Sequence, residues 1–331
     1  MYTDDDLQQA VDKGIFQPSA VSQFREFIAR RNQTHAEDEE GFRLITSFND
    51  IFVVIACLLL LLSAGWVVQA VSAPLALAVV AALSWGLAEF FVLKRKMALP
   101  AIVLLMTFVG SVFGSVLVLA GFPSEQAFVF AAIAGTLAAW LHWTRFHVPI
   151  TVAAGAATAV VFIVASLISL MPGLKDYLNL MMLLSGVLVF LLAMRWDMAD
   201  LKRLSGQSDV AFWLHLTAAP LIVHPVFSNL GIFEGQQTAL DLGIVLLLYL
   251  MLTLISLVID RRAFMVSALI YVLVALTEVL DTYGLAGDSF AYVGVVIGFS
   301  LLLLSGFWHR VRRGLVSSLP PALQARVPTV S

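Results

Sequence analysis

The polar residues with the clearest capacity for chemistry lie inside one apolar segment, residues 210–230. This segment contains two histidines, His215 and His224, and two prolines, Pro220 and Pro225. Each proline removes a backbone donor and its ring clashes with the preceding turn, so the pattern predicts a helix break around these residues. Breaks inside a membrane are tolerated where freed carbonyls line protein or a wet cavity, and they are typical of transporter binding sites.

We interpret this segment as one side of a solute path. His215 and His224 are nine residues apart, on opposite faces of an ideal helix, and a break would let them converge. The alternative is a kinked packing helix whose histidines bond to neighbouring carbonyls. The candidates for the solute path are the polar and proline positions His215, Thr217, Pro220, His224, Pro225 and Asn229.

A pair of histidines could also bind a metal ion or the iron of a haem. His142 and His215 are predicted at comparable depth, where two imidazoles could serve as axial haem ligands. The single cysteine, Cys57, excludes a metal site built on cysteine pairs. No Walker loop, dinucleotide fingerprint, HExxH motif or nucleophile elbow is present in the sequence. We therefore expect no metal, no cofactor and no enzymatic activity, with a membrane-embedded redox or metal enzyme as the alternative.

Acidic residues are concentrated in the segments predicted to face outward. Glu278 and Asp281 are three residues apart and share a helix face, so they are candidates for an outer vestibule that attracts cations. The alternative is that they are solvated loop residues. Glu89 is expected to extend towards Lys94 at the membrane boundary. No acidic residue lies at predicted mid-bilayer depth, which argues against a carboxylate relay for protons.

Composition defines the elements that must position these residues. Of the 331 residues, 60% are hydrophobic and 12% charged, and the mean hydropathy is +0.95. Soluble domains carry roughly 25% charged residues, so a soluble, secreted or disordered protein is excluded. A net charge of −3 gives no basic excess for nucleic acid. The pattern predicts an all-α bundle of ten membrane spans near 49–71, 74–93, 98–120, 126–143, 149–171, 177–195, 210–230, 240–259, 263–281 and 290–308.

The basic residues test this count independently. With ten spans, all but one of the 19 Lys and Arg fall on one side, and Lys175 alone lies opposite. The positive-inside rule makes that side cytoplasmic, so both termini are predicted to be cytoplasmic. The acidic N-terminus has no basic export signal, so the first span is expected to direct its own insertion.

Residues 1–46 have a soluble composition. Two short helical patterns predict a cytoplasmic hairpin with one apolar face, followed by the acidic tether Glu37-Asp38-Glu39-Glu40. The hairpin is too small for a core of its own, so residues 1–31 are expected to pack on the membrane domain, on a second copy or on a protein partner. The transmembrane domain is predicted over 47–310, and a basic, proline-containing cytoplasmic tail over 311–331.

Two segments also suggest a family resemblance. They are Gly41-Phe-Arg-Leu-Ile-Thr-Ser-Phe-Asn49-Asp50-Ile-Phe and Phe212-Trp-Leu-His-Leu-Thr-Ala-Ala-Pro-Leu-Ile-Val-His-Pro225. Together with the hairpin and the basic turns, they resemble uncharacterised multi-spanning bacterial membrane proteins of unknown function. The resemblance implies a location in the bacterial inner membrane and says nothing about a substrate.

Two functions therefore stay open. The first is a permease that passes a small neutral or lipid-like solute beside the seventh span. The alternative is an accessory or scaffold subunit of an envelope complex, recruited through the N-terminal hairpin. The lipid bilayer is the partner common to both.

Overall fold

The computed structural model describes residues 11, 13–17, 19–21, 23–24, 48–201, 206–230, 239–282, 289–324 and 327–328. The chain divides into two compact units, residues 1–42 with Ser331 and residues 43–330. In the first unit, Gly14 has a φ of 71° and its N–H donates to the Val11 carbonyl. A glycine in this left-handed conformation is typical of a helix end. The rest of the predicted hairpin lies largely outside the described residues.

The second unit contains the membrane spans. Within the described residues, ten helices are long and apolar enough to cross a bilayer, which confirms the all-α, ten-span prediction. The elements are α3 (Phe48–Gln69), α4 (Ala73–Ala88), the π-helix η1 (Glu89–Lys94), α5 (Ala98–Leu119), α6 (Glu125–Phe146), α7 (Ile150–Leu170), the 3₁₀-helix η2 (Pro172–Tyr177), α8 (Leu178–Ala199), α9 (Gly206–Ser228), α10 (Ala239–Ile259), α11 (Ala263–Thr282), α12 (Ser289–Ser317) and the short α13 (Pro321–Gln324).

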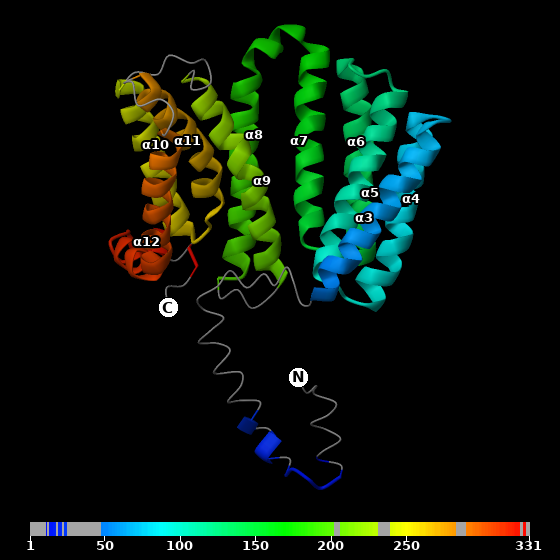
Figure 1. The fold of residues 1–331 in the computed structure, drawn as a ribbon, viewed down its shortest axis with the longest axis horizontal. Coiled ribbons are helices and arrows are strands. Elements are labelled where there is room, and N and C mark those ends of the chain that lie inside the picture. The colour runs from blue at the N-terminus through cyan, green and yellow to red at the C-terminus, as the bar shows by residue number, and fades with distance from the viewer. Residues whose placement is uncertain are drawn as a thin grey trace. The chain divides into compact units, whose positions relative to one another are not determined.

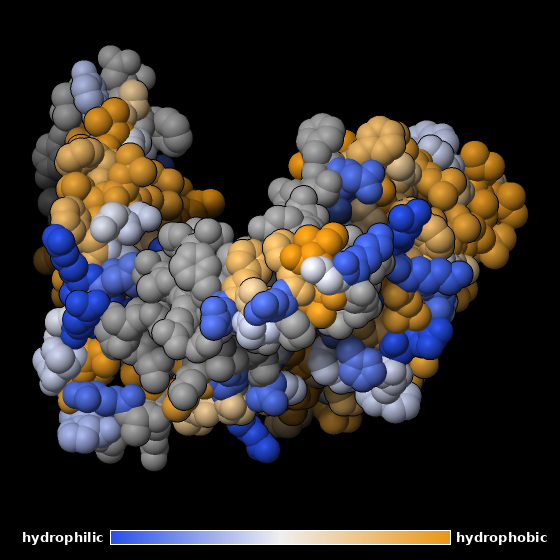
Figure 2. All heavy atoms as spheres, turned by 90° about the horizontal axis from the view of Figure 1, so that it is seen from below, coloured by the Kyte–Doolittle hydropathy of each residue, from blue (hydrophilic) through white to orange (hydrophobic). Residues whose placement is uncertain are grey.

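Successive long helices run in opposite directions (Figure 1). The turns after α4, α6, α8 and α10 therefore lie at one end of the second unit, together with the last residues of α12. We call this the basic end, because Lys94, Arg145, Arg195 and Arg261 all lie there. In Figure 2, which views the molecule from below, hydrophilic residues lie in groups on the near face and hydrophobic residues cover much of the sides. The position of these four cations at one end agrees with the predicted placement of the basic residues.

Two apolar cores hold the spans together. The first core joins α3, α4, α5, α6 and the start of α7, around fully buried residues such as Leu104 and Leu105. The second core joins α7 to α11, around Leu214 and Phe227. Trp213 packs against both cores. Helix α9 is therefore packed on several sides, which matters for the residues it positions.

The predicted break in the seventh span is wrong. Helix α9 runs without interruption from Gly206 to Ser228, with Pro220 and Pro225 inside it. Proline has a φ close to the helical value, so each ring removes one donor without forcing the chain out of the helix. Close packing holds α9 at this level, because a Cβ on Gly186 of α8 would lie 2.9 Å from the carbonyl carbon of Leu221.

Helix α12 also differs from the predicted organisation. It continues to Ser317, so the predicted boundary at residue 310 falls inside a helix. Arg312 is buried there, where its Nε donates to the Leu257 carbonyl and its Nη2 donates to the Pro328 carbonyl. The described residues near the C-terminus are thus attached to the last turn of α10 through one arginine.

Candidate functional site

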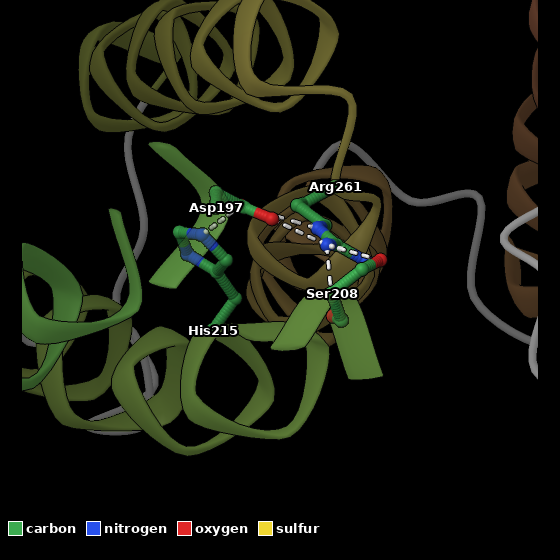
Figure 3. A network of polar contacts seen from close by, with 4 residues as sticks. All are labelled: Asp197, Ser208, His215 and Arg261. Atoms are coloured by element: carbon green, nitrogen blue, oxygen red, sulfur yellow. Dashed lines mark hydrogen bonds and ion pairs between the residues drawn. The ribbon is translucent and has the colours of Figure 1, made fainter. Parts of the chain in front are cut away.

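A buried polar cluster lies at the basic end of the second core (Figure 3). It consists of Asp197, Ser208, His215 and Arg261, and we call it the Asp197 cluster. Asp197 is 1% exposed, His215 0% and Arg261 2%. A carboxylate and a guanidinium are almost never fully buried unless they are paired, and inside a membrane protein such groups are functional candidates by default.

Arg261 is the centre of the ion pairing. Its Nη2 donates to Asp197 Oδ1 at 2.5 Å, and its Nε lies 3.4 Å from Asp197 Oδ2. The same Nη2 also donates to the Ser208 carbonyl at 3.0 Å. The planar guanidinium matches a carboxylate with two parallel contacts. One arginine thus links the last turn of α8 to the first turn of α9.

His215 completes the cluster from α9. Its Nε2 lies 2.9 Å from Asp197 Oδ2, so the carboxylate contacts both the arginine and the imidazole. The rings of Phe190 and Phe264 lie 5.4 Å and 6.2 Å from the His215 ring and exclude water on those sides. If the imidazole is neutral and donates from Nε2, the charges of Asp197 and Arg261 cancel. A proton added to His215 would leave a net positive charge in a buried position.

The chain positions these groups through helix ends. Asp197 is in the last turn of α8, and Ser208 is in the first turn of α9. Asp260 has a φ of 56°, which ends α10 and turns the chain before Arg261. The Arg261 N–H then donates to the Ser256 carbonyl. The tight turn between α10 and α11 thereby points Arg261 towards α8.

Asp260, the residue before Arg261, contacts α12 instead. It accepts a hydrogen bond from Trp308 Nε1 at 2.8 Å and lies 3.6 Å from Arg312 Nε. Arg262 stacks over the Trp308 ring at 4.9 Å. Three consecutive residues in one turn therefore connect α10 and α11 to α8 and α9 on one side and to α12 on the other.

The two histidines of α9 do not come together. His215 contacts Asp197 of α8, whereas His224 Nδ1 lies 2.8 Å from the Tyr271 hydroxyl of α11. His224 itself is exposed. The predicted convergence is wrong because α9 stays helical and the two residues remain on different faces.

The other candidates for the solute path occupy varied surroundings. The Thr217 hydroxyl donates to the Trp213 carbonyl one turn earlier, which is a local helix contact. Pro220 is exposed and Pro225 is buried. Asn229 accepts a hydrogen bond from Asn179 Nδ2 at 3.0 Å, which ties the start of α8 to the end of α9 away from the basic end. Polar contacts therefore occur along the whole of α9, but they do not form a single group.

Only part of the predicted outer vestibule falls within the described residues. Glu278 is half-buried on α11, and Asp281 is in the last turn of the same helix. The side chain of Asp281 lies outside the described residues. The pair therefore stays a prediction.

His142 belongs to a different environment from His215. It is fully buried in the first core among the rings of Trp85, Phe108 and Phe146. Its Nδ1 lies 3.2 Å from the Thr151 hydroxyl. The structure shows no contact between His142 and His215, and no group of three or more His, Cys, Asp or Glu within the described residues is placed to hold a metal ion.

Glu89 has a different partner from the expected one. Its carboxylate accepts two hydrogen bonds from Arg145 of α6, from Nε and from Nη2, each at 2.8 Å. It does not pair with Lys94, because the π-helix that starts at Glu89 places Lys94 over the Phe90 ring. The result is a second bidentate arginine–carboxylate pair at the basic end.

Sequence reasoning missed three members of the Asp197 cluster, namely Asp197, Ser208 and Arg261. Arg261 entered the prediction only as one of the basic residues on the cytoplasmic side, and the burial of these three residues was not foreseen. One signal was available, because Asp197 follows Arg195 and Trp196 directly at the end of an apolar run, where an acid would have to find a partner. The partner lies 64 residues away, and pattern along the chain does not give that distance.

Comparison with protein-family models, with curated proteins and with solved structures gives no match for this chain.

Proposed function

We propose that this integral membrane protein passes a small neutral or lipid-like solute beside α9, and that the Asp197 cluster closes this path at the basic end. The observation that carries the proposal is the burial of Asp197, in the last turn of a candidate membrane span, together with Arg261 from the turn between α10 and α11. Replacing a buried ion pair by well-packed apolar residues is often neutral or stabilising, so a pair of this kind is poorly explained by stability alone.

The contacts of α9 support this location. Polar side chains contact α8 at two levels, from His215 near the middle of α9 and from Asn229 directly after its last residue. Between them, His224 bonds to Tyr271 of α11. Hydrogen bonds between helices can exchange for bonds to a passing solute, whereas an apolar interface offers no such exchange. The apolar surroundings favour a neutral or lipid-like solute over an ion.

The orientation is part of the same proposal. The basic end is cytoplasmic by the positive-inside rule, with both termini on that side, and the membrane is a bacterial inner membrane. The Asp197 cluster then lies at the cytoplasmic end of the path.

Reconstituted protein tests the proposal with two probes. Stopped-flow light scattering of proteoliposomes measures entry of glycerol and urea, and dithionite reduction of a fluorescent phospholipid measures lipid passage. We expect the protein to raise at least one rate several-fold over protein-free liposomes. His224→Phe should change that rate, because His224 lies on the proposed path, whereas the matched variant His142→Phe in the first core should not. Rates equal to those of empty liposomes for both probes would contradict the proposal.

A second candidate function is that of an accessory or scaffold subunit recruited through residues 1–31. It is favoured by the division of the chain into two units. Within the first unit, Ile15 and Phe16 are exposed apolar side chains, and such residues are frequent at protein interfaces. Deletion of residues 1–40 separates the two functions, because it should spare solute passage and abolish co-purification of a partner.

A further inference from the structure

The π-helix η1 gives the basic end an unusual local geometry. The Arg95 N–H donates to the Phe90 carbonyl and the Met97 N–H donates to the Phe91 carbonyl, at 3.1 Å each. The first of these bonds spans five residues, so one turn is wider than in an α-helix. Residues four and five positions after Phe90 therefore both return to its side of the helix. Single π-turns inside α-helices are frequently found at functional sites.

The consequence is a pair of cations over one aromatic ring. Lys94 Nζ lies 5.9 Å and the Arg95 guanidinium carbon 5.6 Å from the centre of the Phe90 ring. Phe90 is 43% exposed, and Lys94, Arg95 and Lys96 are exposed as well. An apolar ring and positive charges thus share one surface at the boundary of a membrane span. We call Phe90, Lys94, Arg95 and Lys96 the basic turn of α4.

The nearest acid does not neutralise the basic turn. Glu89 is held by Arg145 through two hydrogen bonds of 2.8 Å. Within the described residues, Lys94, Arg95 and Lys96 make no ion pair. Three cations therefore remain available to an external anion, beside the exposed ring of Phe90.

We propose that the basic turn of α4 binds the headgroup of an anionic phospholipid, with an acyl chain lying against Phe90. Clusters of Lys and Arg at the end of a span attract anionic lipids by about 1 kcal/mol for each cation. The competing anion is the acidic tether at residues 37–40 of this chain. The exposed aromatic ring favours the lipid, because a purely acidic segment gains nothing from Phe90.

Native mass spectrometry of the full chain in mild detergent tests this proposal. Dioleoyl phosphatidylglycerol and dioleoyl phosphatidylcholine have the same acyl chains, so their difference in affinity isolates the headgroup. We expect tighter binding of phosphatidylglycerol to the wild type. The triple variant Lys94→Gln/Arg95→Gln/Lys96→Gln should lose about tenfold or more in this preference, and Lys94→Arg/Lys96→Arg should retain it.

The chain offers a matched control. Arg195→Gln/Lys202→Gln/Arg203→Gln removes the same number of charges from the next-but-one turn predicted at the same end, so net charge changes equally while the basic turn of α4 stays intact. Preserved preference in this control supports the proposal. Equal loss in both triple variants would overturn it, because the effect would then depend on net charge alone.

Competition by the acidic tether at residues 37–40 would give a different result in the same experiment. If the wild type shows no preference, and Glu37→Gln/Asp38→Asn/Glu39→Gln/Glu40→Gln restores one, the tether occupies the basic turn and the lipid proposal is overturned. Phe90→Ala should weaken phosphatidylglycerol binding without altering its salt dependence. Unchanged binding by Phe90→Ala would overturn the proposal, because no acyl chain would then lie against this ring.

Discussion

The two cores contain similar polar groups near the basic end, but they differ in how deeply these groups are buried and in how they contact one another. Each places a fully buried histidine among aromatic rings, and each has a bidentate arginine–carboxylate pair near by. In the first core the pair is Glu89 and Arg145, with side chains 35% and 53% exposed, and His142 contacts a threonine instead. In the second core the pair is Asp197 and Arg261, both buried, and the histidine shares the carboxylate.

Burial, rather than contact geometry, separates these two arrangements. An exposed ion pair contributes roughly 0–1 kcal/mol to stability, because water already solvates both charges. A buried pair is held by attraction in a low-dielectric setting, and removal of one partner leaves an uncompensated charge. The first core can therefore lose its ion pair and keep its histidine environment. In the second core, loss of Arg261 would leave the buried Asp197 carboxylate without its cationic partner.

The largest expected effect is that of Arg261→Gln. Loss of the guanidinium leaves the buried Asp197 carboxylate with only His215 and a neutral amide near it. We expect a destabilisation of about 3–5 kcal/mol. The measurement is equilibrium unfolding in mixed micelles, followed by helical circular dichroism.

Arg145→Gln is the matched control for this variant. It breaks an equivalent pair of hydrogen bonds at an exposed position, where water solvates both charges, and we expect a much smaller loss than for Arg261→Gln. Similar losses for the two variants would show that burial does not govern the difference between the cores.

The next largest effect is the recovery of stability when both charges are removed. Asp197→Leu/Arg261→Met removes both charges together and replaces them with apolar groups, so no charge is stranded. We expect this double variant to recover most of the loss, so that it is about 3 kcal/mol or more above Arg261→Gln in stability. The same unfolding measurement gives the difference. A double variant less stable than Arg261→Gln would mean that the cluster stabilises the fold through more than charge pairing.

The double variant also sharpens the functional comparison. If Asp197 and Arg261 serve solute passage, the variant should be stable yet altered in the liposome assays. If the cluster serves packing alone, stability and passage should both stay close to the wild type.

The sequence was sufficient to predict the spans, and the reason is physical. Crossing a hydrocarbon layer requires about 20 apolar residues, and this requirement is local to each segment. The predicted limits agree with the helices within a few residues at most ends, as for α5 and α10. The positions of the basic residues are equally local, so their collection at one end was also predicted.

The candidate site was predicted less well because it depends on which helices are neighbours. His215 was singled out correctly as a polar residue at depth, but its partners come from other helices. Asp197 is 18 residues away and Arg261 lies 64 residues from Asp197. The two prolines show the opposite case: local propensity predicts a break, but α9 stays helical where it packs closely against Gly186 at Leu221.

The smallest expected losses of stability are those from replacing the two buried histidines. His215→Phe removes one hydrogen-bond partner from a buried carboxylate, and we expect a loss of about 1–3 kcal/mol. His142→Phe places a ring among the aromatic rings that already surround His142, and the Thr151 hydroxyl at the start of α7 can turn to a backbone acceptor, so a loss below about 1 kcal/mol is expected. Equilibrium unfolding of both variants under one set of conditions gives the comparison. If His142→Phe were the more damaging of the two, the Thr151 contact would outweigh the ionic one, and the distinction between the cores would rest on hydrogen bonding rather than on buried charge.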